Sequence, residues 1–188
     1  MKESLGPRTI LYPAPVLVVG TYDEAGRPNL MTAAWGGICC SDPPCVAVSM
    51  RKATYTHGSI VARKAFTINI LSESQAKQAD YYGMATGRKE DKFAATKITA
   101  IKSDLVDAPY GNEFPLILEC KLLHTIEIGL HTEFIGQIVD VKAEKGVLGA
   151  NGLPEVEKLR PFFYAPGEQK YYASGECLGE AFSIGKET

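Results

Sequence analysis

The segment from Ser49 to Thr56 concentrates groups that bind anions. It holds two cations and three aliphatic hydroxyl groups, contributed by Arg51, Lys52, Ser49, Thr54 and Thr56. It also leads into a predicted helix, and the free N–H groups and macrodipole of a helix N-terminus favour a bound anion. A guanidinium binds phosphate bidentately, whereas a lysine acts as a point charge. The pattern predicts a phosphate site; the alternative is a solvated turn in which Thr56 only caps the helix.

The segment 29–35 has the composition of a site for a flat ring. The small side chains of Ala33 and Ala34 let a planar ligand approach the backbone, whose N–H and C=O groups can bond its polar edge. Asn29 and Thr32 add polar side chains nearby. Trp35 has two interpretations, contact with the ligand or a core anchor, because burying a large aromatic side chain requires no ligand.

The cysteines and histidines form no recognisable framework. The five cysteines are odd in number and contain no C-x-x-C pair, and the adjacent Cys39 and Cys40 are poorly placed to bridge each other. The three histidines lack zinc-site spacing with the cysteines. We therefore expect neither a metal nor a structural disulfide. A reactive thiol near Cys39 is the alternative to small buried side chains.

Bulk composition excludes several classes of function. The formal net charge of −2 over 188 residues gives no basic excess for general binding to nucleic acid or an anionic membrane. No run reaches the roughly 18 to 20 apolar residues that span a bilayer. The N-terminal residues lack the apolar core of a signal peptide, so a soluble cytoplasmic protein is expected.

Short β-branched runs separated by turn residues predict the architecture. Strands are expected at 16–22, 28–35, 44–50, 66–71, 116–126 and 132–143, with a hairpin turn at 23–26. Short helices are expected at 56–64, capped by Thr56, and at 72–82, with Ser72 as N-cap and Gly83 as stop. Gly36 and Gly37 mark a bend or a close backbone approach. The pattern predicts one mainly β, antiparallel domain over 1–188, and closure into a barrel would remove exposed edges.

Several segments, in this order and spacing, resemble the flavin reductase-like family. The segment 15–35, followed by 42–44, resembles the opening of the family's sequences. The segment 49–56 resembles the family's flavin-phosphate loop, 66–69 resembles its next strand, and 91–93 resembles the loop that follows. The stretches 159–164, 171–176 and 181–185 are similar to the flavoredoxins, the FMN-carrying electron-transfer branch of the family. The likeness covers nearly the whole chain.

The resemblance implies a fold and a cofactor. It implies an FMN-binding split β-barrel, antiparallel and Greek-key-like, in a homodimer with flavin sites near the subunit interface. FMN would be bound without a covalent link by the two segments described above. No protein acid or base is expected, since the flavin supplies the redox chemistry and the protein binds and orients it.

Three further residues gain a role only from the resemblance. Lys92 or His131 would place a cation near the N1/O2 edge of the flavin, where it would stabilise the anionic reduced form. Either residue could instead bind phosphate across the dimer, or be a surface charge. Tyr164 would cover the flavin ring, or pack at the dimer seam.

Three functions stay open from the sequence. The first is an electron carrier that receives electrons from NAD(P)H or a protein donor. The second is an NAD(P)H:flavin oxidoreductase that releases reduced FMN, and the third is a barrel that binds haem or another ligand without turnover. The sequence contains no G-x-G-x-x-G unit after a strand, so a nicotinamide would dock on the flavin itself rather than in a Rossmann domain.

Overall fold

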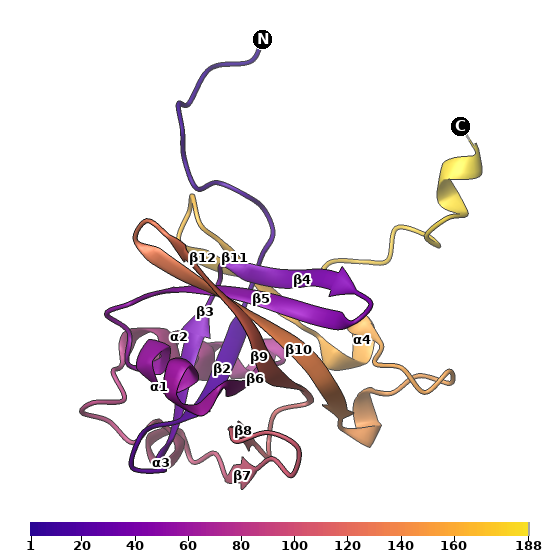
Figure 1. Cartoon of the computed structure of the whole chain (residues 1–188). Coiled ribbons are helices and arrows are strands. Elements are labelled where there is room, and N and C mark those ends of the chain that lie inside the picture. Colours follow the sequence, from indigo (N-terminus) through magenta and orange to yellow (C-terminus); the bar gives the residue numbers. More distant parts are fainter. Residues whose placement is uncertain (188) are drawn as a thin grey trace.

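The computed structural model describes residues 1–187. Antiparallel strands form most of its regular secondary structure (Figure 1). The strands are β1 (Ala14–Pro15), β2 (Leu17–Tyr22), β3 (Pro28–Ala33), β4 (Gly36–Ser41), β5 (Pro44–Arg51), β6 (Ala65–Ile70), β7 (Ala100–Lys102), β8 (Pro109–Gly111), β9 (Leu116–Ile128), β10 (His131–Ala143), β11 (Phe162–Ala165) and β12 (Lys170–Ala173). The helices are α1 (Tyr55–Arg63), α2 (Ala76–Met84), α3 (Lys92–Thr96) and α4 (Val156–Leu159), with 3₁₀ turns at Glu73–Gln75, Lys145–Val147 and Ile184–Glu187.

A seven-stranded sheet forms the body of the molecule, in the order β3-β2-β6-β9-β10-β5-β4. Each neighbouring pair in it is antiparallel. A three-stranded sheet, β1-β11-β12, and a two-stranded sheet, β7-β8, complete the fold. The predicted mainly β, antiparallel architecture is therefore confirmed.

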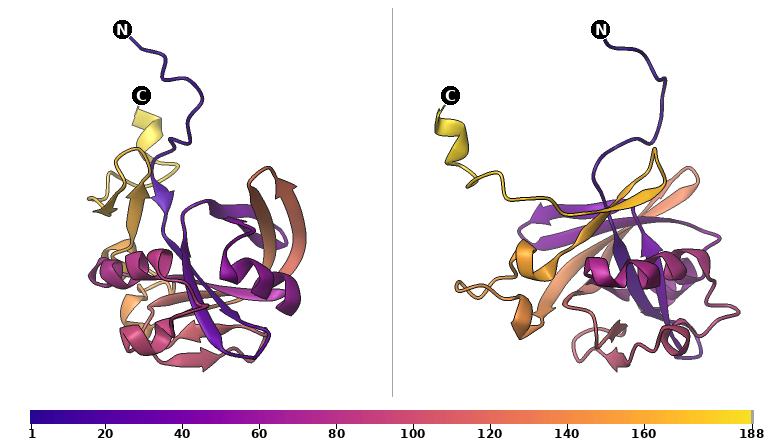
Figure 2. Two further views of the ribbon diagram at one scale, coloured as in Figure 1. Left: turned by 90° about the vertical axis from the view of Figure 1, so that its left-hand side faces the viewer. Right: turned by 180° about the vertical axis from the view of Figure 1, so that it is seen from behind.

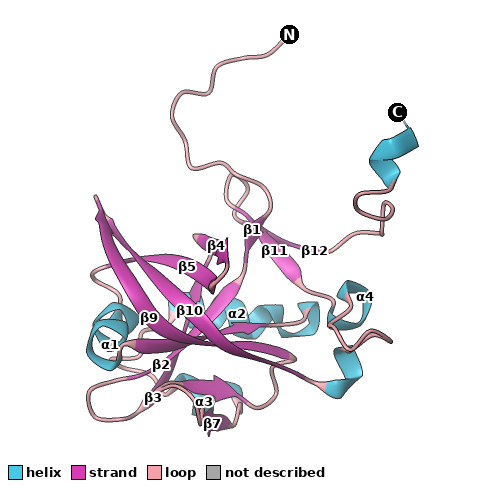
Figure 3. Cartoon of the chain, turned by 45° about the vertical axis from the view of Figure 1, so that its right-hand side comes forward, coloured by secondary structure: helices cyan, strands magenta, loops and turns pink. Residues whose placement is uncertain are grey.

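The large sheet curls so that its two edges approach each other. The chain leaves the β3 edge at Trp35, whose carbonyl accepts a hydrogen bond of 2.7 Å from the amide of Ser49 in β5. The next residue, Gly36, begins β4 and pairs with Val48. Figure 3 shows the curled strands with α1 and α2 at their flanks. The contact between Trp35 and Ser49 joins the two segments that the sequence analysis singled out.

The β2 strand separates two hydrophobic clusters, because its alternate side chains point to opposite faces. Leu17 and Val19 pack inside the curled sheet in a cluster with Val48, Ile60, Phe66, Ile68 and Phe134. Val16 and Val18 face α2, α3 and the small sheet in a cluster with Leu30, Tyr82, Phe93, Phe114 and Phe162. Each large side chain buried in this way stabilises the fold by roughly 1.5–3 kcal/mol. Both clusters hold β3 from opposite sides.

Element boundaries differ from the predicted ones at several places. Helix α1 begins at Tyr55, so Thr54 is the N-cap residue and the prediction that Thr56 caps the helix is wrong. Ser72 is an N-cap as predicted, and it forms a capping box with Gln75, but it starts a 3₁₀ turn that precedes α2. Gly83 lies inside α2 and does not end it. Strands β1, β4, β7, β8, β11 and β12 were not predicted.

Both ends of the chain and one hairpin project from the body. Figure 2 shows the N-terminal segment and the C-terminal 3₁₀ turn extending away from the sheets, and the hairpin between β9 and β10 standing apart from the rest. Side chains on that hairpin are exposed on both faces from Leu123 to Leu130. No helix within residues 1–187 is long and apolar enough to cross a membrane.

Candidate functional site

A cavity of about 680 Å³ lies between β3, β5, the start of α1 and the segment 83–92. Its volume falls within the range typical of small-molecule sites. Most residues of the predicted site line it: Asn29, Thr32, Ala33, Ala34, Trp35, Ser49, Arg51, Thr54, Thr56 and Lys92. Met31, Met50, Ala53, Tyr55, Gly83, Met84, Ala85, Thr86, Gly87, Arg88 and Lys89 complete the wall. The structure therefore brings the two predicted segments together around one space.

One end of the cavity is suited to an anion. The N-terminus of α1 lies in its wall, and the N-cap residue Thr54 directs its hydroxyl to the carbonyl of Arg51 (2.9 Å) rather than to the helix. The first-turn N–H groups of α1 thus have no side-chain cap and remain available to a ligand. Arg51, Arg88 and Lys89 bring three cationic side chains to the same wall.

Thr56 is buried below that end and belongs to a polar pair. Its Oγ1 accepts a hydrogen bond of 3.0 Å from Nδ2 of Asn29, and the two side chains are 1% and 3% exposed as residues. Oδ1 of Asn29 is buried and has no protein partner among the described residues. The acceptor of Asn29 lies against Gly87, so within the pair it is the hydroxyl proton of Thr56, a residue of the cavity wall, that a ligand can engage.

Gly87 brings the backbone close to this pair. A Cβ on Gly87 would collide with the side chain of Asn29 and with the ring of Tyr55. A larger residue would therefore displace Asn29. The glycine keeps the segment 86–89 against the cavity wall, which places the cations that follow it.

Lys92 is a buried cation in the same wall. It is the first residue of α3, whose N-terminus is capped by the carboxylate of Asp91. The resemblance had implied that Lys92 lies in a loop. Its Nζ donates to the carbonyl oxygens of Leu30 (2.7 Å) and Tyr82 (2.9 Å). An ammonium has three N–H donors, so one remains for the cavity. Burial lowers the pKa of Lys92 to about 8, since desolvation disfavours the charged form.

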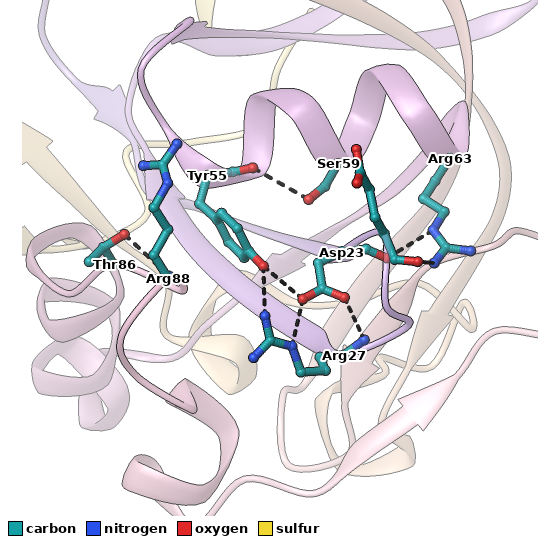
Figure 4. Close-up of polar contacts among 8 residues, drawn as sticks. Asp23, Arg27, Tyr55, Ser59, Arg63, Thr86 and Arg88 are labelled. Atoms are coloured by element: carbon teal, nitrogen blue, oxygen red, sulfur yellow. Dashed lines mark hydrogen bonds and ion pairs between the residues drawn. The ribbon is translucent and has the colours of Figure 1, made fainter.

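A polar network fixes the start of α1 to the β2–β3 turn (Figure 4). The Tyr55 hydroxyl donates to Oδ2 of Asp23 (2.7 Å) and accepts from Nη2 of Arg27 (3.1 Å). Arg27 also donates to both carboxylate oxygens of Asp23, through its Nε (2.7 Å) and its amide (2.8 Å). At the other end of α1, Arg63 donates to the backbone carbonyl of Asp23. These bonds position the helix terminus that faces the cavity.

The same network changes the acidity of Asp23 and orients Arg88. Burial would raise the pKa of Asp23, but hydrogen bonds from Tyr55 and Arg27 outweigh it and lower the value to about 2. The guanidinium of Arg88 lies 5.5 Å from the centre of the Tyr55 ring, within cation–π range. Its Nη1 donates to the carbonyl of Ala53 (3.2 Å). Arg88 is thus held beside the uncapped helix terminus.

A second chamber adjoins the main cavity and shares part of its wall. Ala33, Ala34 and Met84 line both spaces, and so do Thr32 and Gly83. The second chamber has a volume of about 380 Å³. Its other walls are Val16, Asp80, Tyr164, Gln169 and Tyr171. Tyr164 therefore lies in this adjoining chamber and not in the wall of the main cavity.

Two predicted residues lie outside both spaces. Lys52 is exposed and forms an ion pair of 2.5 Å with Glu127. His131 starts β10 and pairs in register with Arg51, but its side chain is not part of either wall. In a single chain neither reaches the cavity, and their roles as cofactor ligands remain predictions.

Several wall residues were missed by sequence reasoning. Tyr55, Gly87 and Arg88 belong to this group, and so do Met84 and Lys89. The sequence did contain a signal for an anion site here. The segment 86–89 is Thr-Gly-Arg-Lys, in which two cations follow a glycine shortly after the end of a helix. Such a segment resembles the 49–56 loop in its chemistry, but nothing local shows that the two loops meet.

Comparisons with known proteins agree with this geometry. The flavin reductase-like domain family matches residues 9–172. The structure is similar to flavoredoxin of Desulfovibrio vulgaris (Miyazaki F), with a TM-score of 0.94 and 54% identity over 98% of this chain and 100% of that one. It is also similar to an FMN-binding protein from Thermus thermophilus crystallised with 1-cyclohex-2-enone, with a TM-score of 0.80 and 25% identity over 96% of this chain and 99% of that one.

A curated relative adds a different context. The chain is 31% identical over 188 residues to the stachydrine N-demethylase reductase subunit Stc3 of Rhizobium meliloti (strain 1021), covering 98% of this chain and 73% of that protein. The chain therefore belongs to the flavin reductase-like family, and its fold is the split barrel of that family.

Proposed function

We propose that the chain binds FMN non-covalently in the main cavity and carries electrons through it, as a flavoredoxin-like protein. One observation carries the proposal: a single cavity joins a cationic helix terminus at one end to small and apolar side chains at the other. FMN has the matching polarity, with a dianionic phosphate, a hydroxylated chain and a flat ring. The similar proteins described as a flavoredoxin and an FMN-binding protein support it.

The side chains present fit each part of FMN. The phosphate is matched by Arg51, Arg88 and the N–H groups of α1. The hydroxylated chain is matched by the polar side chains of Asn29 and Thr56 in the cavity wall. The ring is matched by the small residues of 33–34 and the methionine and tryptophan side chains around them.

The flavin would supply the redox chemistry, and the protein would bind and tune it. Lys92 is a buried cation with one free donor, and positive charge near a flavin favours its anionic reduced form. The two carbonyls that hold Nζ fix its position, so its effect on the flavin would not depend on a mobile side chain. His131 and Lys52 would reach a flavin only from a second subunit.

We further propose a homodimer. Apolar side chains are exposed on edge strand β4, at Ile38, and on the projecting β9–β10 hairpin, at Ile126, Ile128 and Leu130. An exposed edge strand and an exposed apolar hairpin are features that proteins normally cover. A two-fold association is the commonest way to do so. Light scattering of the purified protein tests the oligomeric state.

A second candidate is a reductase that receives hydride from NAD(P)H and releases reduced FMN. The relative described as a reductase subunit of a demethylase favours it. Anaerobic stopped-flow reduction of the FMN-loaded protein by NADH, NADPH and a protein donor separates the two. Reduction without loss of flavin on gel filtration supports the carrier, and flavin that elutes free after reduction supports the reductase. A protein that binds no FMN at all contradicts both.

A further inference from the structure

The chamber beside the ring end of the cavity has features that a flavin alone does not explain. The chamber and the main cavity share the wall residues around Ala33, Ala34 and Gly83. Because the ring of the proposed FMN would lie at these residues, a molecule in the chamber would lie beside that ring. The inference that follows rests on that proposed function. The features of the chamber wall indicate which class of redox partner would bind there.

Gly83 leaves room at the junction of the two spaces. It lies inside α2, where glycine costs helix stability relative to alanine. Packing does not require it, because the nearest atom to an added Cβ would be Cβ of Thr32 at 3.6 Å, an ordinary contact. The absence of a side chain leaves space at the wall that both cavities share.

Tyr171 and Asp80 form a fixed pair in the chamber wall. The Tyr171 hydroxyl donates to Oδ1 of Asp80 at 3.1 Å. Its ring is held between Phe162, with centroids 5.7 Å apart, and Tyr164, with centroids 5.6 Å apart and planes at 49°. Burial first, and then Asp80, raise the pKa of Tyr171 to about 12. The phenol thus stays protonated and donating at neutral pH.

The wall of the chamber carries negative charge and no positive charge among its described residues. Among the described residues of its wall, Asp80 is the only charged one, and two tyrosine rings lie beside it. Aromatic faces and carboxylates attract cations. A negatively charged group seated in the chamber would be repelled, whereas a ring that becomes positive during the reaction would be stabilised where the charge develops.

We propose that Asp80, oriented by Tyr171, stabilises the positive charge that forms on a dihydropyridine ring as it gives a hydride to the flavin. In this step the C4–H bond of a reduced nicotinamide breaks and its hydrogen leaves with both electrons. The flavin is reduced by two electrons, and the nicotinamide leaves as a pyridinium cation. Asp80 accordingly favours a neutral ring that becomes a cation over a ring that carries negative charge, and Tyr171 is its positioning residue.

Two ligands of the same shape and different charge test the proposal. Binding of the 1-methylnicotinamide cation and of neutral nicotinamide to the FMN-loaded protein is measured by calorimetry, without turnover. We expect the cation to bind about two- to fivefold more tightly, the range of a partly exposed charge pair. Asp80→Asn should abolish this preference, and Tyr171→Phe should reduce it.

Tyr172→Phe is the matched control. Tyr172 is the next residue of β12; its hydroxyl donates to Glu168 (2.7 Å) and its ring stacks on Phe163, away from the chamber. This variant should keep the wild-type preference. Gly83→Val, which narrows the junction, should weaken both ligands alike.

The result that overturns the proposal is an unchanged cation-to-neutral ratio in Asp80→Asn, or no binding of either ligand to protein that holds one FMN per chain. Failure of the proposed function gives a different result, since the wild-type protein would then bind no FMN. Single-turnover reduction by NADH provides a second readout. Asp80→Asn should slow it and leave the dissociation constant of FMN unchanged.

Discussion

The buried pair of Thr56 and Asn29 gives the sharpest test of the cavity. We expect Thr56→Val, which keeps the branched shape and removes the hydroxyl, to weaken FMN binding. On the proposed orientation the Thr56 hydroxyl donates to the phosphate or to the chain next to it. A hydrogen bond to a charged group contributes about 1.5–3 kcal/mol, so the dissociation constant of FMN should rise about 10- to 150-fold.

The same substitution also affects the fold, and the structure gives the size of that effect. Nδ2 of Asn29 loses the acceptor that lies 3.0 Å away, while Oδ1 of Asn29 has no protein partner in the described chain. A buried donor left without a partner costs about 1–3 kcal/mol. Thermal unfolding of the apoprotein should therefore show a lower Tm for Thr56→Val than for the wild type.

Thr54→Val is the matched control, because it removes a hydroxyl two residues away. The Thr54 hydroxyl bonds only the nearby carbonyl of Arg51 and does not cap α1, so the loss should be smaller for both stability and FMN affinity. Fluorescence titration of FMN with each apoprotein measures the affinities. If Thr56→Val lowers the Tm but binds FMN as tightly as the wild type, the pair is purely structural and the phosphate lies elsewhere.

Other predictions follow from the charged groups and the exposed surface. Arg88→Ala should weaken FMN about tenfold or more and leave riboflavin binding nearly unchanged in parallel titrations; equal losses would remove the phosphate from this end. Burial lowers the pKa of Lys92 from 10.5 to about 8, so the unfolded chain binds more protons in that interval. The unfolding free energy of the wild-type apoprotein relative to Lys92→Met should accordingly rise between pH 8 and 10.5, as denaturant titrations can show. The low pKa of Asp23 adds stability above pH 4 that is lost as the pH falls toward 2, and Asp23→Asn should flatten that acid limb. Ile128→Lys should shift the proposed dimer toward monomer in light scattering.

Local chemistry made part of the fold predictable. All strands of the large sheet except β4 were predicted from apolar runs bounded by turn residues, and burial on both faces of β2 reinforces the pattern. The start of α1 was predicted one residue late, because Thr54 and Thr56 are both acceptable caps. Only the structure shows that the second of them is buried against Asn29.

The missing parts of the site depend on contacts between distant segments. Arg88 and Tyr171 were not predicted, since each gains its place from a residue far away in the chain, Tyr55 and Asp80 respectively. Lys92 was expected in a loop, but the short helix that Asp91 caps turns it inward to two carbonyls. A hydrophilic residue that is buried by tertiary contacts leaves no periodic signal in the sequence.

The distribution of charge along the two spaces explains how a flavin would be oriented. Arg51, Arg88 and Lys89 lie at one end of the main cavity, and Asp80 is the charged residue of the chamber at the other. A reversed ligand would bring its dianionic phosphate toward a carboxylate and leave the cations without a partner, and both changes are unfavourable. On the proposed function the phosphate of FMN would therefore lie at the α1 end, and its ring would lie at the junction beside Gly83. The same electrostatics that would bind the cofactor would thus present its ring to the chamber in which a redox partner would have to approach it.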